Sequence, residues 1–152
     1  MATISGLMAA AALAEVGQPP TADDRIVALG DSITDGNTYP QIVMQALREA
    51  GRPVPTIVCS GVASDTAALM AARLDRTVLE FKPTLVTFCA GTNDACRGVT
   101  PEQYEASLRE VCGKVKASGA RMVLLTPCTI EPKDGAILRV GKRRFARLKT
   151  GV

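Results

Sequence analysis

The 152-residue chain contains no histidine and no tryptophan, and aromatic residues make up only 3% of it. Its core must therefore be built from valine, leucine, isoleucine, alanine and methionine. Without histidine, both the most frequent general base and the most frequent metal ligand of proteins are absent. The five cysteines include no Cys-x-x-Cys pair, so we predict no zinc site and interpret them as buried free thiols: Cys59, Cys89, Cys96, Cys112 and Cys128.

The chain also lacks an apolar run of membrane-spanning length. Residues 1–14 are apolar and rich in alanine, but a spanning helix needs about 20 such residues. Ala12-Leu13-Ala14 resembles a cleavage site, yet a signal peptide begins with a basic region and the first basic residue is Arg25. We interpret residues 1–24 as a leader and linker and expect a cytoplasmic protein. Export behind a signal peptide is the alternative.

The net positive charge of the chain comes from its last twenty residues. Residues 133–152 carry +6, so the remainder carries −3, because the whole chain has a net charge of +3. We interpret this basic tail as a solvated segment, and binding of nucleic acid or an anionic surface is the minor alternative. The tail contains one acid, Asp134, and seven basic residues: Lys133, Arg139, Lys142, Arg143, Arg144, Arg147 and Lys149.

Short apolar runs alternate with amphipathic segments along residues 25–126. Such alternation predicts a parallel, doubly wound α/β sheet. The clearest helix start is Thr100-Pro101-Glu102-Gln103, which has the residues of a capping box. We expect strands at 25–29, 56–59, 85–89 and 121–126, and helices at 39–50, from Asp65 or Thr66 to about 78, and at 100–118.

The first of these helices is predicted to be amphipathic, and the second should bury an apolar stripe. In the first, the apolar residues at helical spacing are Ile42, Val43, Ala46 and Leu47. In the second, the stripe consists of Leu69, Met70, Leu74 and Val78.

Three loops that follow predicted strands carry residues suited to acyl transfer. Gly30-Asp31-Ser32-Ile33-Thr34 follows the apolar run 26–29, Gly61 follows the second run, and Gly91-Thr92-Asn93-Asp94 follows the third. In an open parallel sheet, ligands bind outside the carboxyl ends of the strands. Ser32 therefore has the position of an exposed nucleophile, with a glycine and an amide side chain on neighbouring strands.

These three blocks resemble, in order, those of the SGNH, or GDSL, family of serine esterases and acyl hydrolases, over residues 25 to about 132. The resemblance implies an incomplete hydrolase domain at 25–132, with a three-layer α/β/α sandwich and a flavodoxin-like sheet of order 2-1-3-4-5. It implies Ser32 as nucleophile and an oxyanion hole formed by the N–H groups of Ser32 and Gly61 and the Asn93 side chain. Gly30, Asp31, Gly91 and Asp94 would shape the loops. No metal or organic cofactor is implied.

The family's fourth block, an Asp-x-x-His, has no counterpart in this sequence. Residues 134–152 are too few for the last strand and the last helix, so we expect both to be missing from the fold. None of Asp31, Asp35, Asp65 and Asp94 is a suitable base for a serine hydroxyl, because an ordinary carboxyl has a pKa near 4. We therefore expect near-zero activity, and self-association through an open sheet edge.

The resemblance implies hydrolysis of small carboxylic esters through an acyl-serine intermediate. Acetylated sugars, lysophospholipids and thioesters are all compatible with it. The alternative is a pseudoenzyme that binds an acyl or sugar ligand without turnover. A nucleic-acid binder that acts through residues 133–152 is a third, less favoured reading.

Overall fold

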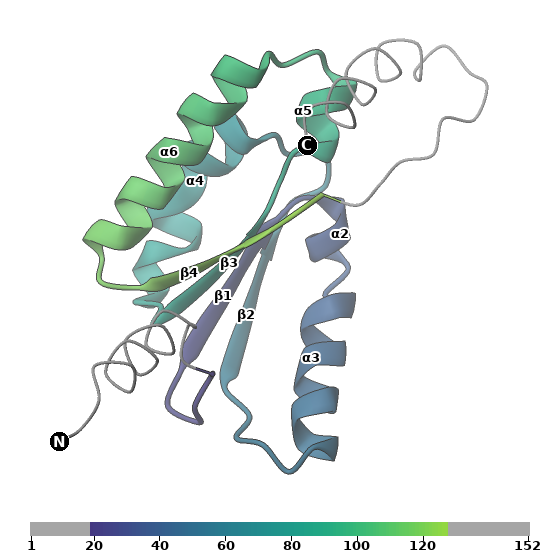
Figure 1. Cartoon of the computed structure of the whole chain (residues 1–152), viewed down its shortest axis with the longest axis vertical. Coiled ribbons are helices and arrows are strands. Elements are labelled where there is room, and N and C mark those ends of the chain that lie inside the picture. Colours follow the sequence, from purple (N-terminus) through teal and green to yellow (C-terminus); the bar gives the residue numbers. More distant parts are fainter. Residues whose placement is uncertain (1–18, 128–152) are drawn as a thin grey trace, which may run out of the picture.

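The sheet of the computed structural model, which describes residues 19–127, has four parallel strands in the order β2-β1-β3-β4 (Figure 1). The strands are β1 Arg25–Gly30, β2 Thr56–Gly61, β3 Leu85–Cys89 and β4 Arg121–Leu125. All four predicted strands are confirmed, as is the 2-1-3-4 part of the predicted order. The predictions for residues 1–18, Cys128 and the basic tail lie outside the described residues.

Three long helices connect the strands, and all three were predicted. They are α3 Thr38–Glu49, α4 Ala67–Thr77 and α6 Pro101–Ala117. The α4 and α6 helices cover one face of the sheet, and α2 and α3 lie on the other (Figure 1). The short elements α2 Ser32–Asp35, η1 Leu79–Phe81 and α5 Thr92–Cys96 were not predicted, because five or fewer residues show no periodicity.

Threonine side chains cap the amino ends of α4 and α6. In α6, Gln103 N–H donates to Thr100 Oγ1 at 3.2 Å and Thr100 N–H donates to Gln103 Oε1 at 3.0 Å, as a capping box requires. In α4, Thr66 is the N-cap and accepts from the N–H of Leu69. The Asp65 carboxylate is thereby free of the capping role and pairs with Arg73.

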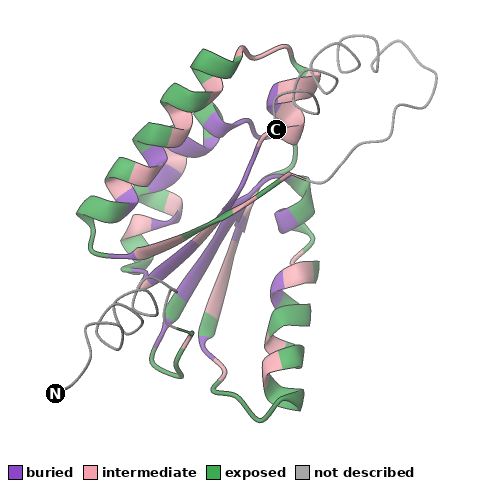
Figure 2. Ribbon diagram, viewed as in Figure 1, coloured by how far each residue is buried: buried purple, intermediate pink, exposed green. Residues whose placement is uncertain are grey.

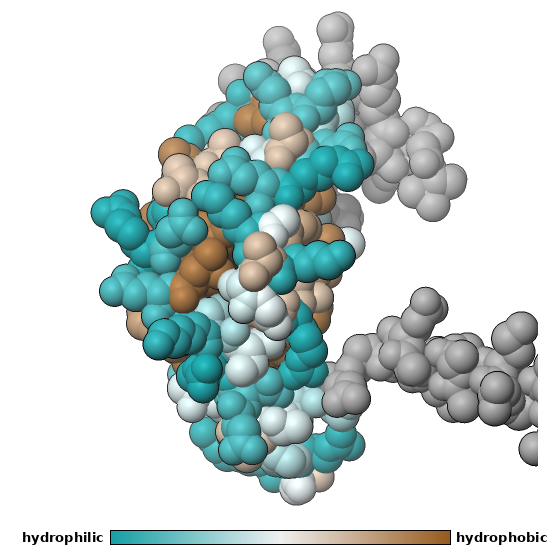
Figure 3. Space-filling model, turned by 90° about the vertical axis from the view of Figure 1, so that its left-hand side faces the viewer, coloured by the Kyte–Doolittle hydropathy of each residue, from teal (hydrophilic) through white to brown (hydrophobic). Residues whose placement is uncertain are grey.

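The hydrophobic core lies between the sheet and the layer of α4 and α6 (Figure 2). Alternate residues of β1 and β3 face this layer, since side chains alternate along a strand. The solvent-facing side of the layer of α4 and α6 is mostly hydrophilic (Figure 3), as expected of amphipathic helices. The fully buried core residues include Val27, Leu29, Val86 and Phe88 from the strands and Met70, Leu74, Val111 and Val115 from the helices.

The predicted apolar stripes are only partly buried. In α3, Ile42 is 61% exposed and Val43 is 43% exposed, so these two apolar positions of the amphipathic helix are not buried by the described residues. The first turn of α3 does reach the sheet, where the Tyr39 hydroxyl lies 3.0 Å from Thr87 Oγ1. In α4, Leu69 is 47% exposed, whereas Met70, Leu74 and Val78 are fully buried, as predicted for the rest of that stripe.

None of the helices between residues 19 and 127 has both the length and the apolar character needed to cross a membrane.

Candidate active site

Ser32 lies at the surface, directly beyond the carboxyl end of β1. The chain turns into α2 at once, because the Asp31 carboxylate accepts from the N–H of Ile33 at 3.0 Å and the Asp31 carbonyl accepts from the N–H of Asp35 at 2.9 Å. Asp31 is only 2% exposed, whereas Ser32 is exposed. The buried aspartate therefore fixes a turn on which the serine hydroxyl is accessible.

Glycine at position 30 allows this close turn. A Cβ atom at Gly30 would lie 2.8 Å from the Cβ of Thr34 and 3.2 Å from the carbonyl oxygen of Cys89. Thr34 is fully buried against the strand end. Any larger residue at position 30 would displace α2, and with it Ser32.

Asn93 comes from the next loop and joins the nucleophile turn to the loop after β2. Its side-chain amide donates to the carbonyl oxygen of Asp65 at 2.9 Å and lies 3.4 Å from Asp31 Oδ2. The longer contact is the weaker one. The bond to the Asp65 carbonyl therefore holds the Asn93 side chain beside the Asp31-Ser32 turn. The amide hydrogen that faces Asp31 is held only weakly and can bind another acceptor. The structure thus places the Asn93 side chain 3.4 Å from Asp31, the residue that precedes Ser32, at the edge of the sheet where β1 and β3 end.

Asp94 supports this arrangement from behind. Its carboxylate is 3% exposed, and both oxygens accept from the N–H of Ala67 at 3.1 Å. Burial raises the pKa of Asp94 above its ordinary value, opposed by the hydrogen bond from Ala67. The preceding Gly91 has φ +121°, a conformation that suits glycine. Through its bonds to Ala67, Asp94 ties α5 to the start of α4.

Gly61 is oriented differently from the predicted oxyanion donor. It pairs with Gly30 in the β1–β2 register, and a Cβ atom there would lie 2.5 Å from backbone atoms of Thr34 and Asp35. The glycine is therefore required for close packing against α2. The N–H of Thr56, at the start of β2, donates to the carbonyl of Asp24. The N–H of Val62, directly after Gly61, donates to the carbonyl of Gly30 in β1. Because successive N–H groups of a strand alternate in direction, that of Gly61 faces the outer edge of β2.

A turn that was not singled out from the sequence lies between β2 and Asp65. The N–H of Asp65 donates to the carbonyl of Val62 at 3.2 Å, and Ser64 has φ +69°. This is the pattern of a type II turn with serine at the third position, where glycine is preferred. The residue type gave no signal for the turn. The turn ends at Asp65, whose carbonyl holds Asn93, so the N–H of Ser64 belongs to this neighbourhood.

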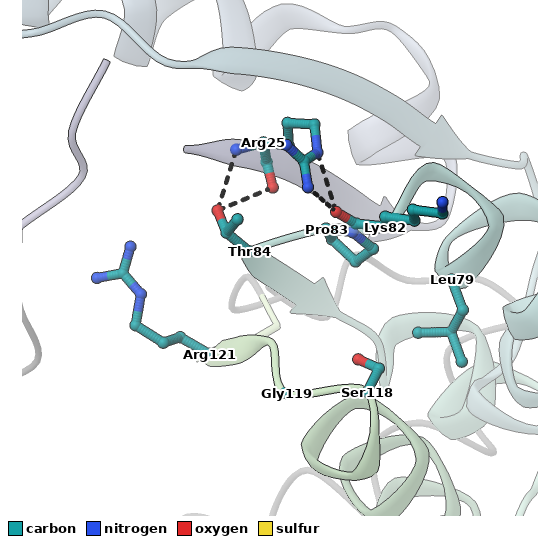
Figure 4. Close-up of a pocket in the computed structure, with 8 residues that line it drawn as sticks. All are labelled: Arg25, Leu79, Lys82, Pro83, Thr84, Ser118, Gly119 and Arg121. Atoms are coloured by element: carbon teal, nitrogen blue, oxygen red, sulfur yellow. Dashed lines mark hydrogen bonds between the residues drawn. The ribbon is translucent and has the colours of Figure 1, made fainter. Parts of the chain in front are cut away.

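A cavity of about 590 Å³ lies at the opposite, amino end of the sheet (Figure 4). Its two arginines already have partners: Arg25 donates to the carbonyl of Lys82 at 2.8 and 3.0 Å, and Arg121 pairs with Asp24 at 2.7 Å. A cavity of about 190 Å³ lies beside the end of β4 and is lined in part by Tyr104 and Leu108. Neither cavity contains Ser32. Between residues 19 and 127, no three His, Cys, Asp or Glu side chains lie together as a metal site would require.

Two curated enzymes match this chain over 68% of its length. An arylesterase of Vibrio mimicus is 30% identical over 110 residues, which cover 54% of that enzyme. The thioesterase 1/protease 1/lysophospholipase L1 of Escherichia coli strain K12 is 31% identical over 108 residues, or 51% of its length. The chain thus spans about half the length of these relatives.

Solved structures share the fold. The α/β hydrolase LAE5 from the metagenome of Lake Arreo has a TM-score of 0.66 at 26% identity, covering 86% of this chain and 76% of that one. A catalytic mutant of Axe2, an acetylxylan esterase of Geobacillus stearothermophilus, has a TM-score of 0.68 at 22% identity, covering 88% and 73%. The model of the GDSL-like lipase/acylhydrolase family matches residues 28–151. With most of its length matched, this chain belongs to the GDSL-like lipase/acylhydrolase family.

Proposed function

We propose that this chain carries the nucleophile and the oxyanion-binding groups of a serine carboxylic-ester hydrolase. The observation that carries the proposal is the convergence of three segments at the carboxyl end of the sheet. Ser32 is exposed on a turn fixed by Asp31. The side-chain amide of Asn93 donates to the carbonyl of Asp65 and lies 3.4 Å from Asp31 Oδ2. Acyl transfer to a serine requires such a nucleophile together with donors for the oxyanion.

Three donors are proposed for the oxyanion. The N–H of Ser32 is the first of α2 and has no partner among the described residues, since the first N–H groups of a helix have none within it. The side-chain amide of Asn93 is the second. For the third, predicted at Gly61, the orientation of the β2 ladder favours the N–H of Ser64 in the following turn.

The base that would accept the serine proton is missing from the 152 residues. The four nearby carboxylates are otherwise engaged or unsuited. Asp31 caps α2, Asp65 pairs with Arg73, Asp94 accepts from Ala67, and Asp35 is exposed to solvent. Removing the base from a triad hydrolase lowers turnover by about 10⁶-fold. We therefore propose near-zero turnover for these residues alone.

The second candidate is a pseudoenzyme that holds an acyl or sugar ligand without cleaving it. Its ligand would be held by the same proposed oxyanion donors. Saturable ligand binding without turnover distinguishes it from a hydrolase.

Candidate substrates are small carboxylic esters, among them acetylated sugars, lysophospholipids and thioesters. The names of the matched relatives support this range, because one is an arylesterase and another a thioesterase and lysophospholipase.

An external base tests the proposal directly. Hydrolysis of p-nitrophenyl acetate is measured for the wild type and Ser32→Ala with and without imidazole, and acetylation of Ser32 is followed by mass spectrometry. Imidazole also hydrolyses the ester in solution, so only the difference between the two proteins counts. Ser118→Ala, an exposed serine at the other end of the sheet, is the matched control.

We expect Ser32-dependent acetylation only when imidazole is present. Robust Ser32-dependent turnover without imidazole would contradict the proposed inactivity. Equal rates and no acetylation in both proteins at high imidazole would contradict the role of Ser32.

A further inference from the structure

Arg73 of α4 was not singled out from the sequence, yet all five N–H bonds of its guanidinium are used at the carboxyl end of the sheet. Nε donates to Asp65 Oδ2 at 2.7 Å. Nη1 donates to Ser60 Oγ at 2.7 Å and to Thr77 Oγ1 at 3.0 Å. Nη2 donates to the carbonyls of Ser60 at 3.0 Å and Gly30 at 3.1 Å. A guanidinium has five such donors, so none is left for a ligand.

These bonds reach both segments that form the proposed oxyanion site. Gly30 is the last residue of β1, two positions before Ser32. Ser60 and Asp65 stand on either side of the turn that contains Ser64. Asp65 also holds Asn93 through its carbonyl oxygen. One side chain therefore links the nucleophile turn, the Ser64 turn and the support of Asn93.

The guanidinium is suited to fix distances between these segments. It is planar and rigid, and its hydrogen bonds are strengthened by its charge. The side chains of Arg73 and Asp65 are only 13% and 10% exposed, so water screens the pair little. A lysine has one nitrogen and cannot occupy both carbonyls and the carboxylate in the same geometry.

We propose that Arg73 is a positioning residue that sets the spacing between the nucleophile turn and the Ser64–Asn93 side of the oxyanion site. The inference rests on the function proposed above. Because its N–H bonds are all occupied, Arg73 acts on the placement of the donors and not on substrate binding. Its loss should lower the rate of acyl transfer and leave the KM for the ester almost unchanged.

The test compares Arg73→Lys with Arg76→Lys on the same helix. Arg76 is exposed and has no hydrogen bond or ion pair among the described contacts, so it is the matched control. NMR follows the side-chain amide of Asn93 and the backbone amides of Ser32 and Ser64, with Val27 and Val86 as core references. In Arg73→Lys we expect the three site signals to shift or broaden while the core references stay in place. Arg76→Lys should change none of them.

Thr77→Val is the second variant, in case Arg73→Lys does not fold. It removes one anchor of the guanidinium and keeps the charge pair with Asp65. We expect smaller shifts of the same three signals. The proposal is overturned if a folded Arg73→Lys, or Thr77→Val where only that variant folds, leaves the Asn93, Ser32 and Ser64 signals unchanged.

The activity arm uses imidazole-assisted acetylation of Ser32. Misplacement by about 1 Å lowers a rate by about 10²-fold, and we expect a loss of that order for Arg73→Lys with little change in KM. If the wild type shows no Ser32-dependent acetylation, the proposed function fails. The NMR comparison still decides whether Arg73 positions these groups.

Discussion

The two ends of the sheet are each held by one buried charge, and the charges are opposite. At the amino end, the carboxylate of Asp24 accepts from Thr21, from Thr84 beside β3 and from Arg121 at the start of β4. At the carboxyl end, the guanidinium of Arg73 donates to the carbonyls of Gly30 and Ser60 and to Asp65. The carboxylate of Asp24 thus binds hydrogen-bond donors at the amino end, and the guanidinium of Arg73 binds hydrogen-bond acceptors at the carboxyl end.

The difference lies in what each charge is connected to. Two of the partners of Asp24, Thr84 and Arg121, line the cavity at the amino end of the sheet, which does not contain Ser32. The partners of Arg73 include the backbone that leads to Ser32 and to the Ser64 turn. Substitutions at the amino end should therefore change stability alone, whereas substitutions at the carboxyl end should change both stability and the site.

The largest difference is expected between Asp65→Ala and Asp24→Ala. Asp65→Ala leaves the 13%-exposed Arg73 without its counterion, and breaking a buried pair costs about 3–5 kcal/mol. Asp24→Ala leaves Arg121, which is 37% exposed and can be hydrated, so we expect a smaller loss of about 1–2 kcal/mol. Urea unfolding followed by circular dichroism measures both.

Glu105→Ala gives the baseline, because it removes an exposed ion pair with Arg109 that is worth at most about 0.5 kcal/mol. Equal losses for Asp24→Ala and Asp65→Ala would show that the two ends are equivalent.

The pH dependence of stability should have opposite signs at the two ends. Hydrogen bonds from Thr84, Thr21 and Arg121 hold the pKa of Asp24 well below its ordinary value. The unfolded chain then takes up this proton first, so the stabilisation from Asp24 is present above about pH 3.9 and is lost as the pH falls below it. Burial raises the pKa of Asp94, so the folded chain takes up that proton first and acidification toward pH 4 adds stability.

Urea midpoints between pH 3 and pH 7 test both signs. The stability advantage of wild type over Asp24→Asn should shrink as the pH falls below about 4. The stability of wild type relative to Asp94→Asn should rise as the pH falls toward the same value. Two differences that change in the same direction with pH would contradict the opposite assignment of the two carboxylates.

Local sequence patterns predicted the elements that pack on α4 and α6. The strands appear as apolar runs, and Thr100 and Gln103 mark the start of α6 by side chains that cap it. The positions of Ser32 and Asn93 followed as well, since adjacent parallel strands end at the same edge. In these cases the signal and its structural cause lie within a few residues of each other.

The parts that could not be predicted depend on partners distant in sequence. Arg73 and Arg76 are both arginines of α4, and residue type alone does not separate the one that reaches β1 from the one that is exposed. Periodicity likewise placed Ile42 on the apolar face of an amphipathic helix, but burial depends on what lies opposite, and Ile42 is 61% exposed. The direction of the Gly61 N–H depends on which side of β2 faces β1.

Of the comparisons between the two ends, the smallest effect is expected from relieving backbone strain. Ser64 near the carboxyl end has φ +69°, and Lys82 near the amino end has φ +48°. A left-handed conformation costs a non-glycine residue about 1–2 kcal/mol, and a glycine removes this cost. The glycine also raises the conformational entropy of the unfolded chain, which lowers the free energy of unfolding by about 0.4–1 kcal/mol. Ser64→Gly and Lys82→Gly should therefore each stabilise the fold by about 0.5–1 kcal/mol.

The two glycine variants should nevertheless differ at the site. Lys82→Gly retains the carbonyl that accepts from Arg25, so the NMR signal of the Asn93 side-chain amide should stay where it is. Ser64→Gly changes the turn that ends at Asp65, whose carbonyl holds Asn93, so the same signal should move even though the fold becomes more stable. A shift in both variants, or in neither, would mean that the strained turn at the carboxyl end is not coupled to Asn93 in the way that its hydrogen bonds indicate.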